Sequence, residues 1–520
     1  MDFRRLLHVF VFEVWRLSNR NVVLRSPVRF LAQLVYWNFE DSWKKTLREN
    51  RDKNNFHNRY VREGKIPTQV LVITDKNLSN LEYEGVSLLL NHIRVPYRVN
   101  YINDNPNLSL VIFTDETIYE KKRKECKWDK NTAFIVFSSQ IRNDKEIRPN
   151  NRVFIKESST KFLPGYDGLR SEFAARTIKA IRQIVTIPLV TGMSKRSVGL
   201  RIDDVKGAQI TSYLSQIVKH GWLPNLGIFV DELMKNKGDV ISYLSDLDKK
   251  EIVSISPHSY SSDDYIFYNY AKGRPFNNVE FSNIWVDVLG KFEKLNLTIS
   301  PVINAHFHAL SRSAALQMSE IGAKYFFSEL SVDHHTLIPD NGYWPAGDPV
   351  CSTGKIDPSG VYQLSSGDCV LDKLNRRSRY DFLEHVGNYD LHKIRKRILD
   401  RLQLSVECGF AAYITTHEYL INEMGLEQNK ILWEVIESEL YETLGHDLNK
   451  ESLCNIARNF EVMNYSSLNS VTVKEDSLVV EMIGTTNSAD NLTVFSNNNL
   501  VNISVPEYKN SCEIVIDYEN

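Results

Sequence analysis

Cysteine is scarce in this sequence, and its spacing does not match a disulfide framework. The six cysteines lie far apart along 520 residues, and no two of them form a C-x-x-C pair. A disulfide-stapled secreted scaffold carries far more cysteine per residue, so that class of protein is excluded. We therefore predict reduced, mostly structural thiols.

Neither sign of charge is in excess. The chain has 63 Lys and Arg residues against 65 Asp and Glu residues, a formal net charge of -2. No overall field would attract the protein to polyanions, so we predict no nucleic-acid partner. The first α/β stretch also lacks the G-x-G-x-x-G and G-x-x-x-x-G-K-[ST] turns, which leaves nucleotide binding without support.

The N-terminal region contains no apolar run long enough to cross a membrane. The first residues resemble a signal peptide, but Glu13 and Arg16 interrupt an apolar stretch that is already short. The pattern indicates an amphipathic helix that docks on the protein's own body. As an alternative, residues 1–40 could associate peripherally with a membrane surface, with Arg4 and Arg5 beside the lipid headgroups.

Strand and helix patterns alternate over most of the chain, which predicts an α/β protein with parallel sheets. Seven strand-then-helix units in the central part favour a distorted (β/α)7 barrel. The tail instead alternates apolar and polar residues between Asn- and Ser-rich turns, as in an antiparallel sheet. The predicted parts are an N-terminal helical segment (1–65), an open α/β domain of Rossmann or flavodoxin type (66–190), the barrel (196–462) and a small β-sandwich-like domain (465–520).

Polar side chains gather where the strands of the predicted barrel end. In a (β/α) barrel the carboxyl ends of the strands meet at one face, where active sites form. A metal ion there could activate a water molecule and polarise a carbonyl. The side chains concerned are Asp203, Asp204, His258, His306, His308 and His417.

Each of these residues has an ordinary structural explanation as well. Asp203 and Asp204 could cap the following helix, although an extended backbone would also send their carboxylates in different directions, one to a metal and one to its water. His258 could be a zinc ligand or a hydrogen-bonding loop residue. His306 and His308 share one face of a strand, either as metal or substrate ligands or as a buried pair satisfied by backbone carbonyls.

His417 ends a hydrophobic strand. The ordinary pKa of histidine suits a group that protonates a leaving amine near neutral pH. Polar groups at the ends of several separate strands are less easily explained by chance than any one of them alone.

The strand-end motifs resemble those of the polysaccharide deacetylase superfamily, also called NodB-like or carbohydrate esterase family 4. The matching segments are Ile202-Asp203-Asp204, His258-Ser259-Tyr260-Ser261-Ser262 and Thr415-Thr416-His417. The resemblance implies that Asp203 is the catalytic base and His417 the acid. It also implies that Asp204 and His258 bind a divalent metal, for which zinc is the first expectation.

The layout of the chain is similar to the N-deacetylase half of the heparan sulfate N-deacetylase/N-sulfotransferases. Those proteins also place an open α/β domain before the deacetylase barrel, and the similarity extends over residues 66–445. No segment follows that could bind a sulfate donor, so sulfation is not expected.

One position departs from the family pattern. The second histidine of the family motif falls on Ser262, which leaves the metal short of the three protein ligands usual for catalytic zinc. His306, or else His308, is the preferred substitute, and Asp263 or Asp264 comes next. Without a substitute, the protein could be a glycan-binding barrel that has lost catalysis.

A Gly-, Pro- and aromatic-rich loop at residues 340–355 is the expected sugar-binding segment. Tyr343 and Trp344 can stack on pyranose rings, Asp348 can accept bonds from hydroxyl groups, and His308 is a further candidate contact. An ordinary surface loop is the alternative.

The sequence thus predicts a metal-dependent N-deacetylase that acts on N-acetylhexosamine units of a cell-surface polysaccharide or glycolipid. The expected location is the cytoplasm, with peripheral association at the inner face of the membrane as an extension. A glycosidase is a weaker alternative, because it needs two carboxylates across a sugar ring, and adjacent Asp203 and Asp204 do not by themselves provide them.

Overall fold

The fold was analysed in a computed structural model, which describes the chain between residues 60 and 517 with several gaps. No helix among the described residues is long and apolar enough to cross a membrane. The described ranges are 60–306, 312–328, 353–355, 362–365, 369–370 and 391–517, interrupted at 64–65, 76–80, 101–107, 127, 139–150, 164–165, 170, 193–195, 237, 270–275, 321, 324, 475, 487–489 and 497–498.

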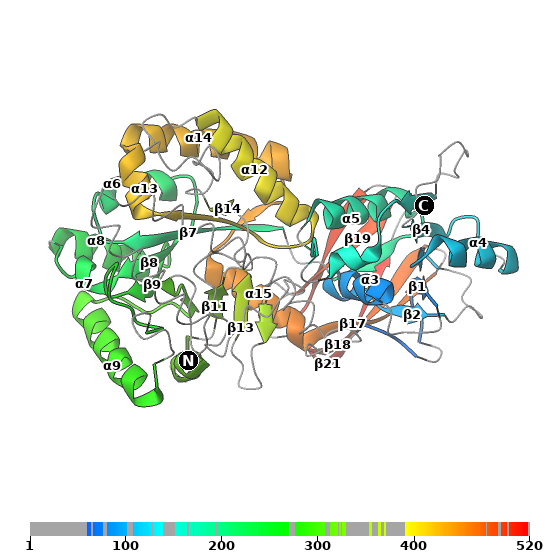
Figure 1. The fold of residues 1–520 in the computed structure, drawn as a ribbon, viewed down its shortest axis with the longest axis horizontal. Helices are drawn as coiled ribbons and strands as arrows, with labels where there is room; N and C mark the ends of the chain where they lie inside the picture. The colour runs from blue at the N-terminus through cyan, green and yellow to red at the C-terminus, as the bar shows by residue number, and fades with distance from the viewer. Residues whose placement is uncertain are drawn as a thin grey trace, which may run out of the picture.

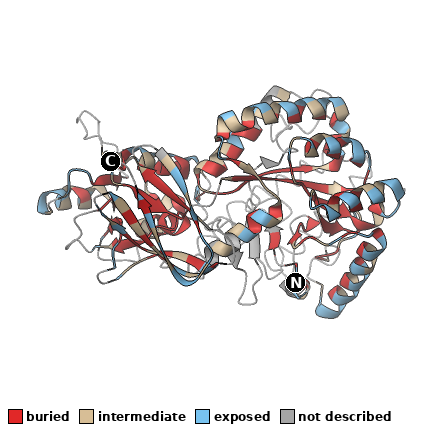
Figure 2. Ribbon diagram, turned by 180° about the vertical axis from the view of Figure 1, so that it is seen from behind, coloured by how far each residue is buried: buried red, intermediate tan, exposed pale blue. Residues whose placement is uncertain are grey.

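The described residues form two lobes that lie side by side in Figure 1. We call residues 196–465 the central lobe. Residues 60–191 and 466–517 make up the terminal lobe, which joins the two ends of the described chain. The inner strands of the parallel sheets are largely buried and the outer faces of the helices are exposed, as Figure 2 shows, whereas β21 of the terminal lobe is mostly exposed or half-buried.

The terminal lobe contains a five-stranded sheet in the order β2-β1-β3-β4-β5, parallel throughout. Its inner strands β1, β3 and β4 are uninterrupted apolar runs with every residue buried, as expected for a sheet covered on both faces. Helices α4 and α5 begin after Asp115 and Ser171, whose side chains accept bonds from backbone N–H groups of the first turn. The elements are β1 (Val70–Ile73), α3 (Leu81–His92), β2 (Tyr97–Val99), β3 (Leu110–Phe113), α4 (Glu116–Glu125), β4 (Ala133–Phe137), β5 (Arg152–Ile155), the 3₁₀ turn η3 (Ser159–Phe162) and α5 (Glu172–Ile184).

Antiparallel strands complete the terminal lobe. They form two three-stranded sheets in the orders β17-β18-β21 and β20-β19-β6, and the short β6 comes from the middle of the chain. Their inward side chains share one hydrophobic cluster with the helices of the parallel sheet. The strands are β6 (Leu189–Thr191), β17 (Ser466–Val473), β18 (Ser477–Thr486), β19 (Asp490–Ser496), β20 (Asn499–Val505) and β21 (Tyr508–Asp517).

The central lobe is built on parallel strands in the order β14-β15-β7-β8-β9, with β16 beside β7. A second sheet has the order β10-β11-β13-β12, and an isolated bridge between Ile255 and Ile299 brings it next to β9. The strands are β7 (Ser197–Val205), β8 (Asn225–Phe229), β9 (Ser254–Ser259), β10 (Val302–Ile303), β11 (Tyr325–Ser328), β12 (Thr353–Lys355), β13 (Tyr362–Ser365), β14 (Cys369–Val370), β15 (Ala412–His417) and β16 (Asn449–Lys450).

These strands do not close into a ring among the described residues. The chain therefore has a mixed α/β fold with parallel sheets, but the predicted (β/α)7 closure is not observed. Strands β10 and β14 contain only two residues each, so they contribute few ladder hydrogen bonds with which to join the two sheets.

Helices cover the sheet of the central lobe. In the view of Figure 1, α12 and α14 lie above it and α9 lies below. Trp222 and Trp433 are both buried, and their rings meet edge to face at 5.7 Å in the core between α14 and the sheet. The helices are α6 (Ile210–Val218), α7 (Val230–Leu233), α8 (Gly238–Lys249), α9 (Asn278–Leu295), α10 (Arg312–Ser319), α12 (Leu391–Glu407), α13 (Glu418–Met424), α14 (Leu426–Leu444) and α15 (Leu453–Tyr465).

Buried polar contacts join segments that are distant in sequence. The guanidinium of Arg94, which has a left-handed backbone with φ of 56°, donates to the carbonyl oxygens of Gly192 (3.1 Å) and Ser466 (2.8 Å). His92 Nε2 lies 2.6 Å from the carbonyl oxygen of Cys408, next to the end of α12. These bonds hold the terminal lobe against the chain that enters and leaves the central lobe.

Candidate functional site

The site begins at a distortion in strand β7. The pairing of β7 with β8 is regular up to Ile202 and resumes at Val205, so Asp203 and Asp204 lie in an irregular stretch. Asp204 has φ of 55°, a left-handed conformation that costs a residue with a side chain on the order of 1–3 kcal/mol. The simple alternation expected for an extended strand therefore does not apply here. The distortion brings the Asp204 side chain toward two histidines.

His258 also lies at an irregularity, this time between β8 and β9. The register skips from Pro257 to Ser259, and the imidazole of His258 is buried. Its Nδ1 lies 2.6 Å from the backbone carbonyl oxygen of Asn304, which can only accept. Nδ1 therefore carries the proton, and Nε2 is left with the lone pair that a metal ligand needs.

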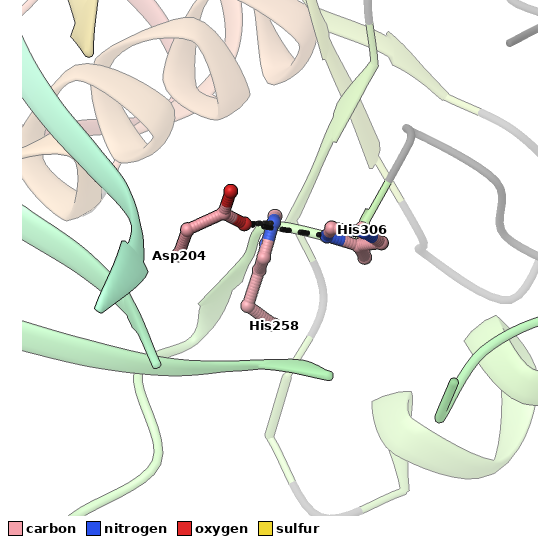
Figure 3. A group of neighbouring side chains, drawn as sticks. All are labelled: Asp204, His258 and His306. Carbon is pink, nitrogen blue, oxygen red and sulfur yellow. Dashed lines mark ion pairs between the residues drawn. The ribbon is translucent and has the colours of Figure 1, made fainter. Parts of the chain in front are cut away.

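Asp204, His258 and His306 converge on one point (Figure 3). Asp204 Oδ1 lies 3.3 Å from His258 Nε2 and 3.4 Å from His306 Nδ1, and the three atoms lie within 4.8 Å of one another. Ligand atoms about 2.0–2.2 Å from a tetrahedral zinc would lie about 3.3–3.6 Å apart. The two measured separations thus fit a shared cation.

The bonding of the Asp204 carboxylate also indicates a site for a cation. Oδ1 is buried, and neither imidazole nitrogen forms a hydrogen bond of normal geometry with it, although both lie within ion-pair distance. A buried carboxylate oxygen without such a bond is costly unless a cation satisfies it. The residues present therefore fit a divalent metal.

The charge states of the group are those of metal ligands. Burial alone would raise the pKa of Asp204, but protons on the facing nitrogens of His258 and His306 hold that pKa well below its ordinary value, and a divalent cation bound there would replace those protons. Burial lowers the pKa of His306, and the carboxylate of Asp204 opposes this only in part. An ionised carboxylate and a neutral imidazole are the forms that bind divalent metals.

Asp203 lies beside this group with a different partner. Arg201, two residues earlier on the same strand, donates to it through both Nε and Nη2, with Nε at 2.9 Å from Oδ1. Burial alone would raise the pKa of Asp203, but the charge of Arg201, followed by His258 and His417, lowers it overall. Asp203 is therefore ionised at neutral pH and fixed in direction by Arg201.

His417 ends the neighbouring strand β15. In the parallel pairing of β15 with β7, its Cα is the direct partner of that of Asp203. The ring of His417 lies 5.4 Å from that of Tyr419, and the side chain is partly exposed. The strand register thus places His417 next to the two carboxylates, on the open side of the site.

Gly227 and two aromatic residues complete the walls of the site, and sequence reasoning missed them. A Cβ atom on Gly227 would lie 2.7 Å from Asp203 Oδ1 and 3.2 Å from His258 Nδ1, so a larger residue does not fit on β8 there. The Phe229 ring lies 5.8 Å from that of His258, and the Tyr265 ring lies 5.5 Å from that of His306.

Signals for the missed residues exist in the sequence but are weak. Arg201 stands two residues before Asp203 and therefore on the same face of an extended strand, which suggests an ion pair. Gly227 interrupts an apolar strand, which is typical of a close approach by a neighbouring group.

Not all of the predicted residues are brought together. His308, Tyr343, Trp344 and Asp348 lie outside the described residues. Asp263 and Asp264, the lower-ranked substitutes for the missing histidine, are exposed, as is Ser262 itself, and neither aspartate belongs to the group around Asp204.

Sequence comparison finds no relatives for this chain: no protein-family model matches it, and neither does any curated protein. Comparison of structures finds proteins described as polysaccharide deacetylases and as carbohydrate esterases of family 4. The similarity to the heparan sulfate enzymes stays a prediction.

Three of these solved structures indicate the extent of the likeness. A Mycobacterium smegmatis protein described as a polysaccharide deacetylase has 11% identity and a TM-score of 0.36, over 54% of this chain and 95% of its own. A Parabacteroides distasonis protein described as a glycoside hydrolase/deacetylase has 11% identity and a TM-score of 0.37, over 63% and 85%. A family 4 carbohydrate esterase from Streptomyces lividans has 11% identity and a TM-score of 0.25, over 49% and 91%. The likeness is partial and does not by itself assign a function.

Proposed function

We propose that this protein is a metal-dependent hydrolase that removes N-acetyl groups from N-acetylhexosamine units of a glycan. The observation that carries the proposal is the arrangement at the ends of β7, β9 and β10. Three side chains with the atoms and spacing to hold a metal ion meet there beside the Arg-bound carboxylate of Asp203. A ligand set of one carboxylate and two imidazoles, with an open position for water, is typical of catalytic zinc sites.

Each residue has a role in this proposal. Asp204, His258 and His306 would hold the metal, and zinc is the first expectation. A bound divalent cation supplies an acidic water molecule and a positive charge for the oxyanion. Asp203 accepts the proton of the attacking water, and Arg201 keeps that carboxylate ionised and aimed. His417 donates a proton to the nitrogen of the departing amine as the amide C–N bond breaks, leaving acetate and a free amine.

The substrate assignment extends the site beyond the described residues. Tyr343 and Trp344 would stack on sugar rings, and Asp348 and His308 would bind polar groups of the substrate. We propose a polysaccharide or glycolipid of the cell surface as the natural substrate. The enzyme would work in the cytoplasm, with residues 1–40 able to bind the inner face of the membrane.

One observation favours a second candidate. Ser262 stands where the related motif has its second histidine, as would be expected if the site had lost catalysis and kept only glycan binding. His306 argues against this alternative, because it supplies a nitrogen within 3.4 Å of Asp204 Oδ1 from a different strand end.

Acetate release from an N-acetylglucosamine oligosaccharide tests the proposal. The wild-type protein should release acetate, lose that activity with a chelator and regain it when zinc is added. Asp203→Asn should lower kcat by about 10²–10⁴-fold, the usual contribution of a general base, while metal binding persists. Glycan binding by a metal-loaded wild type that releases no acetate would instead support the glycan-binding alternative.

A further inference from the structure

Glu418 is a buried carboxylate that the proposed mechanism does not use. It is the first residue of α13, directly after His417, and only 2% of its surface is exposed. Its side chain bonds to the segment that follows β7. Oε2 accepts from the backbone N–H of Lys206 at 2.6 Å, and Oε1 accepts from the N–H of Gly207 and the hydroxyl of Tyr213, both at 3.1 Å.

The residues that Glu418 holds form the turn between β7 and α6, residues 206–209. This turn begins two residues after Asp204, at the end of β7, and it is conformationally demanding. Asp204, Gly207 and Gln209 have φ values of 55°, 91° and 55°, all in the left-handed region, and Gln209 begins α6 without a side-chain cap. Left-handed residues with side chains persist only where the surrounding structure holds them.

A second side chain, Asn236, bonds to the same turn. Asn236 Nδ2 donates to the carbonyl oxygen of Lys206, and a Cβ atom on Gly207 would lie 2.8 Å from that Nδ2. Lys206 therefore donates its backbone N–H to Glu418 and accepts a bond from Asn236 at its carbonyl oxygen. The Glu418 contact is the one that comes from the strand end carrying His417.

Stability alone does not explain a carboxylate at this position. Burial raises the pKa of Glu418 to about 7, although the bonds from Lys206, Tyr213 and Gly207 pull it down. The charged form is therefore less stable in the folded protein than in water. A buried group that is unfavourable for folding at neutral pH is most readily explained by a geometric role.

We infer that Glu418 is a positioning residue for the proposed deacetylation. By bonding to the turn after Asp204, it fixes the end of β7, with Asp203 and Asp204, relative to the end of β15, with His417. The inference rests on the proposed function, because it takes Asp203 as the base and His417 as the acid. Glu418 itself does not contact the substrate. Its role is to keep the base and the acid at their working separation.

The test is Glu418→Gln, which keeps the size of the side chain but turns an N–H toward the N–H groups of the turn. We expect kcat to fall about 10–100-fold, KM to change less than about threefold and the bound metal to stay the same. The backbone amides of residues 206 and 207 should exchange with solvent faster. An unchanged kcat, or a loss of kcat that merely follows a loss of bound metal, would overturn the inference.

Two further variants keep the result interpretable if Glu418→Gln folds poorly. Tyr213→Phe removes one of the three bonds and retains the ring, so it should lower kcat in the same direction by a smaller factor. Glu427→Gln changes an exposed carboxylate in the first turn of α14 and should leave kcat and exchange as in wild type. A Tyr213→Phe protein with the wild-type kcat and exchange would also contradict the inference.

Hydrogen exchange separates this inference from the proposed function. If the wild-type protein releases no acetate, the deacetylase proposal fails. Exchange at residues 206 and 207 still reports whether Glu418 holds the turn. Unchanged protection in Glu418→Gln would then overturn the positioning role by itself. Faster exchange together with an active wild type and a lower kcat is the result we expect.

Discussion

Two adjacent carboxylates, Asp203 and Asp204, are ionised for different reasons. Arg201 neutralises the first, whereas the second faces two imidazoles across distances that suit a shared cation. This difference fits the separate roles proposed for them, a base and a metal ligand. The family resemblance implied these roles, but Arg201 was not predicted, because a single arginine in a strand has many ordinary uses.

Glu418 gives a prediction for stability at the same scale. Its pKa is about 7 in the folded protein against an ordinary value of 4.5, so the folded state holds this proton more tightly than the unfolded state. Its contribution to stability is therefore greatest below pH 4.5 and is lost as the pH rises to about 7. The loss relative to Glu418→Gln should be on the order of 3 kcal/mol over that window.

Urea unfolding of both proteins between pH 5 and pH 8 measures this difference. As the pH rises, the free energy of unfolding of wild type should fall relative to that of Glu418→Gln. A gap independent of pH would show that Glu418 does not titrate in this window.

The strand ends of the central lobe could be predicted, but their local geometry could not. Alternating strand and helix patterns place Asp203, His258 and His417 at the carboxyl ends of strands, and the parallel pairing brings those ends to one edge. The irregularities at Asp204 and His258 arise from how β7, β8 and β9 pair with one another. Because such irregularities depend on how two strands pair, the sequence of a single strand does not predict them.

Strand β8 provides a prediction at the scale of elements. Gly227→Ala places a methyl group 2.7 Å from Asp203 Oδ1, so the carboxylate or the neighbouring His258 must move. A displacement approaching 1 Å can lower turnover about 10²-fold, and we expect a loss of kcat/KM of that order in a folded protein.

Gly290→Ala in α9 is the matched control, because a Cβ there meets no atom within 4 Å. It should keep the wild-type activity and raise stability by up to about 1 kcal/mol, since alanine favours a helix interior over glycine. Equal activity of the two alanine variants would contradict the packing assigned to Gly227.

At the scale of the whole molecule, the lobes are built from segments that sequence order does not group together. Strand β6 contains three residues and pairs with β19, some three hundred residues later. Such a short strand is not distinguishable from a loop by its own pattern, so its partner could not be predicted. Strands β1, β3 and β4 of the parallel sheet were predictable because each is an uninterrupted apolar run, and the strands of the tail because they alternate apolar and polar residues.

Arg94 gives a test of how the terminal lobe is fixed to the segments that lead into and out of the central lobe. Arg94→Ala leaves the carbonyl oxygens of Gly192 and Ser466 without their buried donor. We expect a loss of about 3 kcal/mol in the free energy of unfolding, as for other hydrogen bonds to charged groups. The folded fraction should keep its kcat, because Arg94 lies outside the site. A large fall in kcat with unchanged stability would contradict this structural role.

The central claim is that Asp204, His258 and His306 bind one divalent cation. Zinc titration of the metal-free protein, followed by calorimetry, tests it most directly in the wild type and in Asp204→Ala, His258→Ala and His306→Ala, with His308→Ala as the comparison. We predict one site per chain in wild type and in His308→Ala, and a weakening of at least about 10-fold in each of the other three variants. A wild type that binds no zinc, or a His306→Ala variant that binds it as tightly as wild type, would contradict the account.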